Sequence, residues 1–389
     1  KKLTQIFHED PPLSLYVHLP WCIKKCPYCD FNSHEVLTSG FHEELYLNAL
    51  IDDLELELDR IRDRRIISIF LGGGTPSLFS PESLDRLLNS ARTQLNLGSD
   101  IEVTIEANPG AIEAEKFREY RALGINRLSL GIQSFDNQSL TSLGRIHNSS
   151  EAKRAIEFGK EAGFKNFNLD LMFGLPNQSI DDALSDLKQA VDQSPTHVSW
   201  YQLTIEPNTV FASKPPKLPR EDRIWTMQEK GAKFLKENNF QQYEISSFTR
   251  ENHISIHNMN YWQFGDYIGI GAGSHGKITN ISSGRIERYV RHKIPERYIE
   301  LVGCKNAITE KKVLEINEIP LEFMMNALRL TKGIPTNLFL ERTGLPIELI
   351  KEELLLAEDG DLLNHYKNKI KPSFRGQRYL NDLLQIFMK

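Results

Sequence analysis

The chain has 389 residues, of which 40% are hydrophobic and 25% are charged, and its formal net charge is −5 at pH 7. These values are ordinary for a soluble globular protein with one large domain and a smaller one, and the net charge does not favour nucleic acid or an anionic membrane as a partner. No apolar run reaches the ~20 residues of a membrane-spanning helix, and no apolar export signal begins the chain, so we expect a cytoplasmic protein.

Predicted strands alternate with predicted helices from residue 14 to residue 204. The strands cover residues 14–19, 66–71, 101–105, 127–130, 167–173 and 197–204. The helices cover residues 41–61, 113–123, 137–143, 151–162 and 181–191, and a further helix begins at Pro81 behind a Ser80 cap. This alternation predicts a parallel sheet covered by helices. Six strand–helix units favour an α/β fold with a partial (β/α)6 barrel over a full eight-stranded barrel.

The later part of the chain has a different pattern. A helix over 222–238 and a strand from Tyr243 lead into a segment rich in aromatic residues and then a glycine-dense turn, and helices follow over 320–330, 336–343 and 346–356. We predict a core barrel at 12–240, a connecting region at 241–310, and a smaller, mainly helical, winged-helix-like domain at 311–389.

Three of the four cysteines form the pattern Cys22-x3-Cys26-x2-Cys29, directly after the first predicted strand. A closed zinc site has four protein ligands, as does an ordinary [4Fe–4S] cluster. Three cysteines leave one iron of a cluster open to an amino and a carboxylate group. The spacing favours the cluster, with zinc completed by His18 or His34 as the alternative. A disulfide is less favoured in a reducing compartment.

Polar groups also follow the next predicted strands. A glycine run ends the second strand, Glu106 ends the third, Gln133 the fourth, and Asp170 lies near the end of the fifth. The carboxyl ends of barrel strands carry the active site in such folds. A single acidic residue at a strand end is more often a turn or helix cap, and the glycine run alone fits a tight turn equally well. Five successive strand ends with suitable groups favour a site.

These groups suit S-adenosylmethionine. The open iron would bind its amino acid end, which the backbone of Gly73 and Gly74 can approach because glycine has no Cβ. Glu106 and Asp170 can accept hydrogen bonds from its ribose hydroxyls or amino group. Arg145 can offset the charge of its carboxylate.

The cysteine pattern, with Tyr28 before its last cysteine, resembles the radical S-adenosylmethionine signature. The segments Gly72-Gly-Gly-Thr-Pro76, Glu106-Ala-Asn-Pro109, Gly131-Ile-Gln-Ser134 and Gly174-Leu-Pro176 resemble the branch that contains oxygen-independent coproporphyrinogen III oxidase. The resemblance covers nearly the whole chain and implies S-adenosylmethionine beside a [4Fe–4S] cluster. It also implies a set of cofactor-contacting residues, which are Tyr16, Tyr28, Gly73, Gly74, Thr75, Glu106, Gln133, Arg145 and Asp170.

Within this branch, three features favour the HemW haem chaperones over the oxidase. Phe31 stands where the oxidase has a fourth cysteine, and only fifteen residues precede Tyr16, where the oxidase has a long extension. The segment His257-Asn258-x-x-Tyr261-Trp262 is similar to the His-Asn-x-x-Tyr-Trp motif of the chaperones. The resemblance implies haem binding through His257 and haem transfer to apo-haemoproteins. The alternative function is that of the oxidase, which cleaves S-adenosylmethionine to decarboxylate coproporphyrinogen. A homodimer and a peripheral association with a membrane are both possible for either function.

Without the resemblance, the residues themselves indicate less about two segments late in the chain, which begin at His257 and at Gly271. On a helical turn, His257 and Tyr261 would share one face, and Asn258 and Trp262 another. A lone histidine among aromatic residues is more often a structural hydrogen-bond donor than a haem ligand. Gly271-Ala-Gly273-Ser-His-Gly276 fits the dinucleotide-binding pattern, but a predicted strand follows it instead of a helix. We expect this turn to be a close backbone approach near the cofactor end of the barrel, and Cys304 to be a plain buried thiol.

Overall fold

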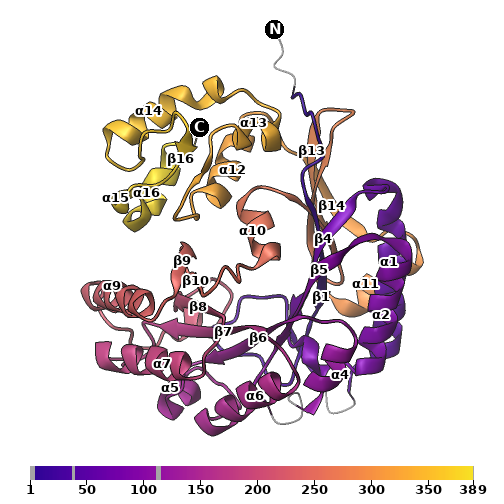
Figure 1. Cartoon of the computed structure of the whole chain (residues 1–389). Coiled ribbons are helices and arrows are strands. Elements are labelled where there is room, and N and C mark those ends of the chain that lie inside the picture. The colour runs from indigo at the N-terminus through magenta and orange to yellow at the C-terminus, as the bar shows by residue number, and fades with distance from the viewer. Residues whose placement is uncertain (1–4, 37–39, 111–114, 389) are drawn as a thin grey trace.

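The computed structural model describes residues 5–36, 40–110 and 115–388, within which the main feature is a twelve-stranded sheet (Figure 1). Six of its strands within this part of the chain pair in parallel and in chain order. They are β1 (Leu13–Leu19), β4 (Arg65–Gly73), β5 (Asn96–Ala107), β6 (Arg127–Gln133), β7 (Asn166–Phe173) and β8 (His197–Gln202). The predicted α/β fold with a partial (β/α)6 barrel is confirmed.

Helices cover the outer face of these strands (Figure 1). They are α1 (Glu43–Ile61), α2 (Pro81–Gln94), α4 (Phe117–Ala122), α5 (Asn137–Ser142), α6 (Ser149–Glu161), α7 (Ile180–Asp192) and α9 (Glu221–Glu237). The Ser80 side chain accepts a hydrogen bond from the Ser83 backbone, which confirms the predicted cap of α2. Residues 113 and 114 of the predicted helix at 113–123 lie outside the described part.

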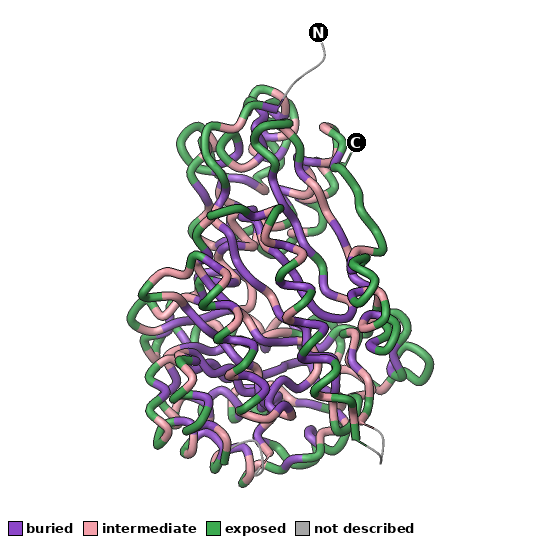
Figure 2. The backbone as a smooth tube through the Cα atoms, turned by 90° about the vertical axis from the view of Figure 1, so that its right-hand side faces the viewer, coloured by how far each residue is buried: buried purple, intermediate pink, exposed green. Residues whose placement is uncertain are grey.

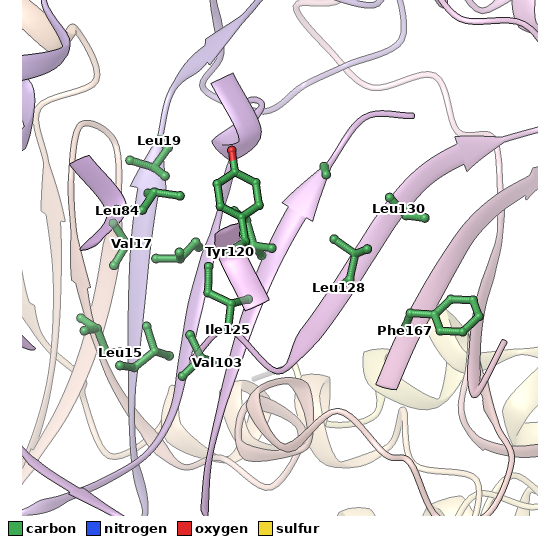
Figure 3. Packing of buried hydrophobic residues seen from close by; sticks show 14 of the residues in the cluster. Leu15, Val17, Leu19, Leu84, Val103, Tyr120, Ile125, Leu128, Leu130 and Phe167 are labelled. Atoms are coloured by element: carbon green, nitrogen blue, oxygen red, sulfur yellow. The ribbon is translucent and has the colours of Figure 1, made fainter. Parts of the chain in front are cut away.

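The main core lies between the sheet and these helices. Leu15, Val17 and Leu19 alternate along β1 and point toward the helices, as Leu128 and Leu130 do on β6 (Figure 3). Side chains alternate between the two faces of a strand, so the intervening polar residues of β1 point into the barrel. Figure 2 shows this separation for the whole chain, with buried residues along the strands and exposed residues on the outer turns of the helices.

The sheet continues beyond the six parallel strands on both sides. β11 (Asp266–Ile270) pairs in parallel with β1, and the antiparallel strands β12 (His275–Asn280), β13 (Arg285–Arg291) and β14 (Ile308–Val313) follow it. At the other edge, β10 (Ser247–Thr249) and β9 (Gln241–Glu244) add to β8. The predicted connecting region therefore supplies strands to both edges of the sheet.

Two short helices, α10 (Ile256–Trp262) and α11 (Pro295–Gly303), lie in this region, and a third, α8 (Val210–Ser213), precedes it. α10 contacts β4 and the smaller domain, and it lies between them in Figure 1. α8 follows β8, and α11 packs on α1. Cys304 follows α11 directly and is exposed, so the prediction of a buried thiol is wrong. The prediction treated cysteine as a small apolar residue, but a position just after a surface helix has nothing to cover it.

The smaller domain has its own hydrophobic core and is mainly helical, as predicted. Its elements are α12 (Ile319–Ala327), β15 (Ile334–Pro335), α13 (Leu338–Thr343), α14 (Lys351–Asp359), β16 (Lys369–Ile370), α15 (Phe374–Arg378) and α16 (Leu380–Gln385). A boundary at 311 falls inside β14, so we propose that this domain begins after Val313. None of the helices in the described ranges is both long and apolar enough to cross a membrane.

A buried group of charges ties α1 to β13. The Arg291 guanidinium lies 2.8 Å from the Asp53 carboxylate and 2.5 Å from the Glu57 carboxylate, and all three side chains are almost fully buried. The Tyr298 hydroxyl of α11 donates a hydrogen bond of 2.8 Å to Asp53. Arg291 thus compensates the charge of Asp53, whereas Glu57 also pairs with Arg60 of α1 at 3.4 Å.

We predict that Arg291→Ala lowers the free energy of unfolding by about 3–5 kcal/mol, because it leaves the buried Asp53 carboxylate without its cation and leaves Glu57 with Arg60 alone. Urea denaturation followed by tryptophan fluorescence measures the change. The control is Arg297→Ala, which removes the exposed pair with Glu300 on α11 and should cost less than about 1 kcal/mol. Equal effects of the two substitutions would contradict this account of Arg291.

Candidate functional site

Most of the predicted site residues line one cavity of about 330 Å³. It lies at the carboxyl ends of β4 to β7, where the loop that follows β1 covers them. Its walls include Cys22, Cys26, Tyr28, Cys29, Gly73, Gly74, Thr75, Glu106, Gln133, Arg145 and Asp170. The volume falls within the ~300–1,000 Å³ of typical small-molecule sites. Five strand ends therefore do converge, as the sequence pattern predicted. We call this space the smaller cavity.

The cysteine loop is held by backbone pairing and by donors to sulfur. β2 (Trp21–Cys22) pairs in parallel with β3 (His34–Glu35), which closes the loop. The Thr75 hydroxyl donates to Cys22 Sγ at 3.5 Å, and the Arg145 guanidinium donates to Cys26 Sγ at 3.5 Å. Cys29 Sγ lies 3.9 Å from the Ser33 hydroxyl. Such donors stabilise thiolates, which are the form that binds metal.

The three cysteine side chains of the described loop are not grouped around a single point. Across the described residues, no three His, Cys, Asp or Glu side chains are placed to hold one metal ion. A [4Fe–4S] cluster presents a different iron to each thiolate, so its three ligands lie farther apart. Of the alternative zinc ligands, His18 has partners on both ring nitrogens, the Tyr16 hydroxyl at 3.0 Å and the Asn32 carbonyl oxygen at 2.8 Å. His34 has a partner on Nε2, the Lys293 carbonyl oxygen at 3.3 Å.

The glycine run approaches its neighbours too closely for any side chain. Gly73 has a φ of +116°, and a Cβ there would lie 2.6 Å from the His18 ring. A Cβ on Gly74 would lie 2.6 Å from the Trp21 carbonyl oxygen. The Gly73 backbone N–H donates to Glu106 at 3.1 Å. The glycines are therefore required by the contact between the end of β4 and the cysteine loop, beyond a simple turn.

Two acidic side chains, Glu106 and Asp170, line the smaller cavity. Asp170 accepts hydrogen bonds from the Ser129 hydroxyl at 3.1 Å and from the Asn168 side chain at 2.9 Å. Burial raises the pKa of Asp170. Burial, with repulsion from Asp170, raises the pKa of Glu106 to about 7. At neutral pH, Glu106 is thus divided between its acid and carboxylate forms and can both donate and accept.

Two further side chains of this cavity were missed by the sequence analysis. The Asn108 side chain accepts from Arg145 at 2.6 Å and donates to Thr75 at 2.8 Å, so it connects two predicted site residues. The Tyr201 hydroxyl on β8 donates to Gln133 at 2.8 Å. Asn108 stands in the same strand-end segment as Glu106, and that position was a usable signal. Tyr201 has no comparable motif around it.

A second, larger cavity of about 620 Å³ adjoins the smaller one. The two share part of their lining, namely Cys29, Phe31, Gly73 and Glu106. Tyr16, a predicted cofactor contact, lines only the larger cavity. The glycine-dense turn after β11 also reaches it, and β12 follows that turn as predicted. A Cβ on Gly271 of this turn would lie 2.4 Å from the His18 carbonyl oxygen, so the expected close backbone approach is confirmed. The Tyr46 hydroxyl accepts from the Ala272 N–H and donates to the same carbonyl.

The motif that begins at His257 lies on the short helix α10, and its histidine lines neither cavity. His257 is 1% exposed. Its Nδ1 lies 2.9 Å from the Ser68 hydroxyl, and its Nε2 lies 3.2 Å from the Tyr261 hydroxyl. Burial lowers the pKa of His257 to about 3, so the ring is neutral. Ser68 donates its own proton to Ser14, which leaves His257 Nδ1 as a donor and Nε2 as an acceptor.

Other residues of α10 do reach the cavities. Asn258 and Trp262 line the smaller cavity, and Tyr261 lines the larger one. The Glu102 carboxylate accepts the backbone N–H groups of Ile256 and His257 at 3.0 Å each. A carboxylate at a helix N-terminus is favourable and fixes the position of α10. His257 and Tyr261 therefore share a face, and Tyr261 separates His257 from the larger cavity.

We predict that Glu106→Gln stabilises the ligand-free protein at pH 8 and has little effect at pH 5. Because the pKa of Glu106 is raised from 4.5 to about 7 in the folded state, stability falls as pH rises from about 4.5 to 7 and stays low above 7, where folding has to desolvate a charged carboxylate. The expected gain at pH 8 is roughly 3 kcal/mol. Thermal unfolding at both pH values measures it. Glu157→Gln, at an exposed position on α6, is the control, and a gain independent of pH would contradict the prediction.

Comparison with known proteins identifies the relatives of this chain. Residues 16–190 match the Radical SAM superfamily, and residues 314–379 match the HemN C-terminal domain. The chain is similar in structure to coproporphyrinogen III oxidase (HemN) from Escherichia coli, a radical SAM enzyme. The TM-score is 0.83 and the identity is 22%, over 98% of this chain and 91% of that chain. This likeness shows a shared fold.

Two curated relatives are similar over nearly their whole length. The heme chaperone HemW of Haemophilus influenzae is 46% identical over 97% of this chain and 98% of the relative. The heme chaperone HemW of Escherichia coli is 44% identical, again over 97% of this chain and 98% of the relative. The chain therefore belongs to the HemW heme chaperone family, within the radical SAM superfamily.

Proposed function

We propose that this protein is a haem chaperone, which binds haem and delivers it to apo-haemoproteins while carrying a [4Fe–4S] cluster and S-adenosylmethionine. The observation that carries the proposal is the pair of adjoining cavities. One has the three cysteines in its wall, the other is large and partly aromatic, and α10 contributes side chains to both. The names of the HemW relatives support the same function.

In this proposal, Cys22, Cys26 and Cys29 bind the cluster, which when bound supplies electron transfer and an open iron. Other residues of the smaller cavity hold S-adenosylmethionine. The Gly73 and Gly74 backbone lies beside its amino acid end. Glu106 and Asp170 receive its hydroxyl and amino hydrogens, and Arg145 lies beside its carboxylate. The remaining proposed contacts are Tyr28, Thr75 and Gln133, whereas Tyr16 faces the larger cavity.

His257 has a less direct place in the haem site. Its Nε2 accepts a hydrogen bond from Tyr261, whose side chain lines the larger cavity. We propose that His257 contributes to haem binding by holding Tyr261 and α10 in position. Contact between His257 and the haem iron would require Tyr261 to move aside.

The alternative function is oxygen-independent coproporphyrinogen III oxidation. The likeness in fold to the oxidase from Escherichia coli favours it. Against it, Phe31 stands at the position of the oxidase's fourth cysteine, and it lies 62% exposed in the wall between the cavities. Turnover of coproporphyrinogen to protoporphyrinogen by the reconstituted, reduced protein would overturn the chaperone proposal.

We predict that anaerobic reconstitution with iron and sulfide gives about four irons per chain. Replacing any one of Cys22, Cys26 and Cys29 by Ala should remove most of this iron, because each thiolate would hold a separate iron. Cys304→Ala is a matched control, since this free cysteine is exposed and far from the loop in sequence, and it should keep the full content. One zinc per chain with no uptake of iron would contradict the cluster.

We also predict that His257→Ala weakens haemin binding, because Tyr261 loses its hydrogen-bond partner in α10. Titration with haemin, followed by its absorbance in the Soret region, measures the dissociation constant. His42→Ala, an exposed position before α1, should bind as the wild type does. An unchanged affinity and spectrum in the His257 variant would remove this residue from the haem site.

A further inference from the structure

The wall of the larger cavity contains one histidine that is exposed and one lysine whose ammonium group is free of close partners. His275, at the start of β12, lines the cavity and is exposed. Among the described residues, no hydrogen bond or ion pair engages its ring. Lys293, which follows β13, also lines the cavity, and its ammonium group likewise has no partner within the described part of the chain. Neither residue has a role in the function proposed above.

We propose that the larger cavity is the haem site, in which His275 binds the haem iron and Lys293 pairs with a propionate. This inference rests on the proposed haem-chaperone function and supplies its iron ligand. The cavity offers the three kinds of group that haem requires, which are a nitrogen ligand for iron, aromatic surface for the macrocycle, and a cation for the carboxylates.

The protonation state of His275 suits iron binding. Desolvation in the cavity, with the nearby charges of Arg288 and Lys293, lowers the pKa of His275. The ring is therefore neutral at pH 7, which is the form that binds metals. The other histidine in this cavity is unsuited, because both ring nitrogens of His18 already have partners. His257 is buried behind Tyr261.

The aromatic surface comes from two tyrosines and Phe31. The rings of Tyr261 and Tyr267 lie edge to face with centroids 4.5 Å apart, and both line the cavity. The Tyr267 hydroxyl lies 2.9 Å from the Arg288 guanidinium, which fixes the ring. Phe31 is exposed at the wall shared with the smaller cavity. A flat apolar macrocycle gains both dispersion and desolvation energy against such rings.

Charges along the cavity set the orientation of the ligand. Asp30 and Glu106 line it together with Lys25, on the side of the cysteine loop. The Lys25 ammonium already donates to the carbonyl oxygens of Phe31 at 3.0 Å and Ser33 at 3.3 Å. Lys293 is instead free to pair with an added carboxylate. Repulsion from Asp30 would turn the propionates away from the cysteine loop and toward Lys293.

The test compares haemin with metal-free protoporphyrin IX, which keeps the propionates but lacks iron. His275→Ala should weaken haemin binding roughly tenfold or more and leave the metal-free affinity unchanged. His275→Met should restore affinity but change the Soret and visible spectrum, because sulfur replaces nitrogen on the iron. Lys293→Ala should weaken both ligands roughly threefold to fivefold. The dimethyl ester of the porphyrin should be insensitive to Lys293.

Two control variants and the behaviour of the wild type distinguish a wrong assignment of His275 from a failure of the proposed chaperone function. His42→Ala and Lys305→Ala change exposed residues outside both cavities and should bind both ligands as the wild type does. If wild type fails to bind haemin, the chaperone proposal fails and the inference fails with it. If wild type binds haemin and His275→Ala binds it with the same affinity and spectrum, only the assignment of His275 is overturned.

Discussion

The position of β1 between β4 and β11 is the constraint on which the rest of the structure depends. β4 follows β1 closely in the chain, whereas β11 lies some 250 residues away, and both pair with β1 in parallel. Tyr46 of α1 fixes the ends of β1 and β11 together, since its hydroxyl joins His18 to Ala272. The cysteine loop, the glycine run and the turn after β11 therefore meet at one edge. The larger cavity is lined by all three segments, and the smaller one by the cysteine loop and the glycine run.

Buried polar groups make this arrangement specific. Asp53 accepts hydrogen bonds from Tyr298 and from the Gly271 backbone while it pairs with Arg291, so α1, α11 and the turn after β11 are fixed by one carboxylate. Inside the barrel, Ser14 accepts from Ser68 and from Asn260, which places α10 against β1 and β4. A buried polar group without a partner costs free energy, and alternative packings of α10 would break these bonds. These bonds thereby restrict the positions of the Tyr261 and Trp262 side chains of α10.

Much of the fold and of the smaller cavity was predictable, because their signals are local. Alternation of strands and helices is visible over short windows, and parallel strands bring their carboxyl ends to one edge by geometry alone. Three cysteines within eight residues specify a site without any knowledge of tertiary contacts. Glu106, Gln133 and Asp170 were predicted in this way, since each lies at or near the end of a predicted strand.

The features that sequence could not supply depend on contacts between distant segments. No local sequence pattern predicts that β11 pairs with β1. Nor does any local pattern predict that β12 comes close to the cysteine loop. Tyr16 and His257 both have side chains that could contact a ligand. Sequence does not distinguish a position in a cavity wall from one on the inward face of a barrel strand, as for Tyr16, or on the buried face of a short helix, as for His257. The exposure of Cys304 likewise follows from what packs beside α11. His275 was visible only as part of a glycine-rich turn.

The wall that the two cavities share has a thermodynamic consequence. Cys29, Phe31, Gly73 and Glu106 would each contact the occupants of both spaces, so a ligand in one changes the environment of the other. Linkage then requires reciprocity: the factor by which one ligand alters the affinity of the second equals the factor by which the second alters that of the first. Glu106, poised between two protonation states, adds the proton as a third linked ligand. For the proposed chaperone, the uptake and release of haem would then depend on what occupies the smaller cavity and on pH.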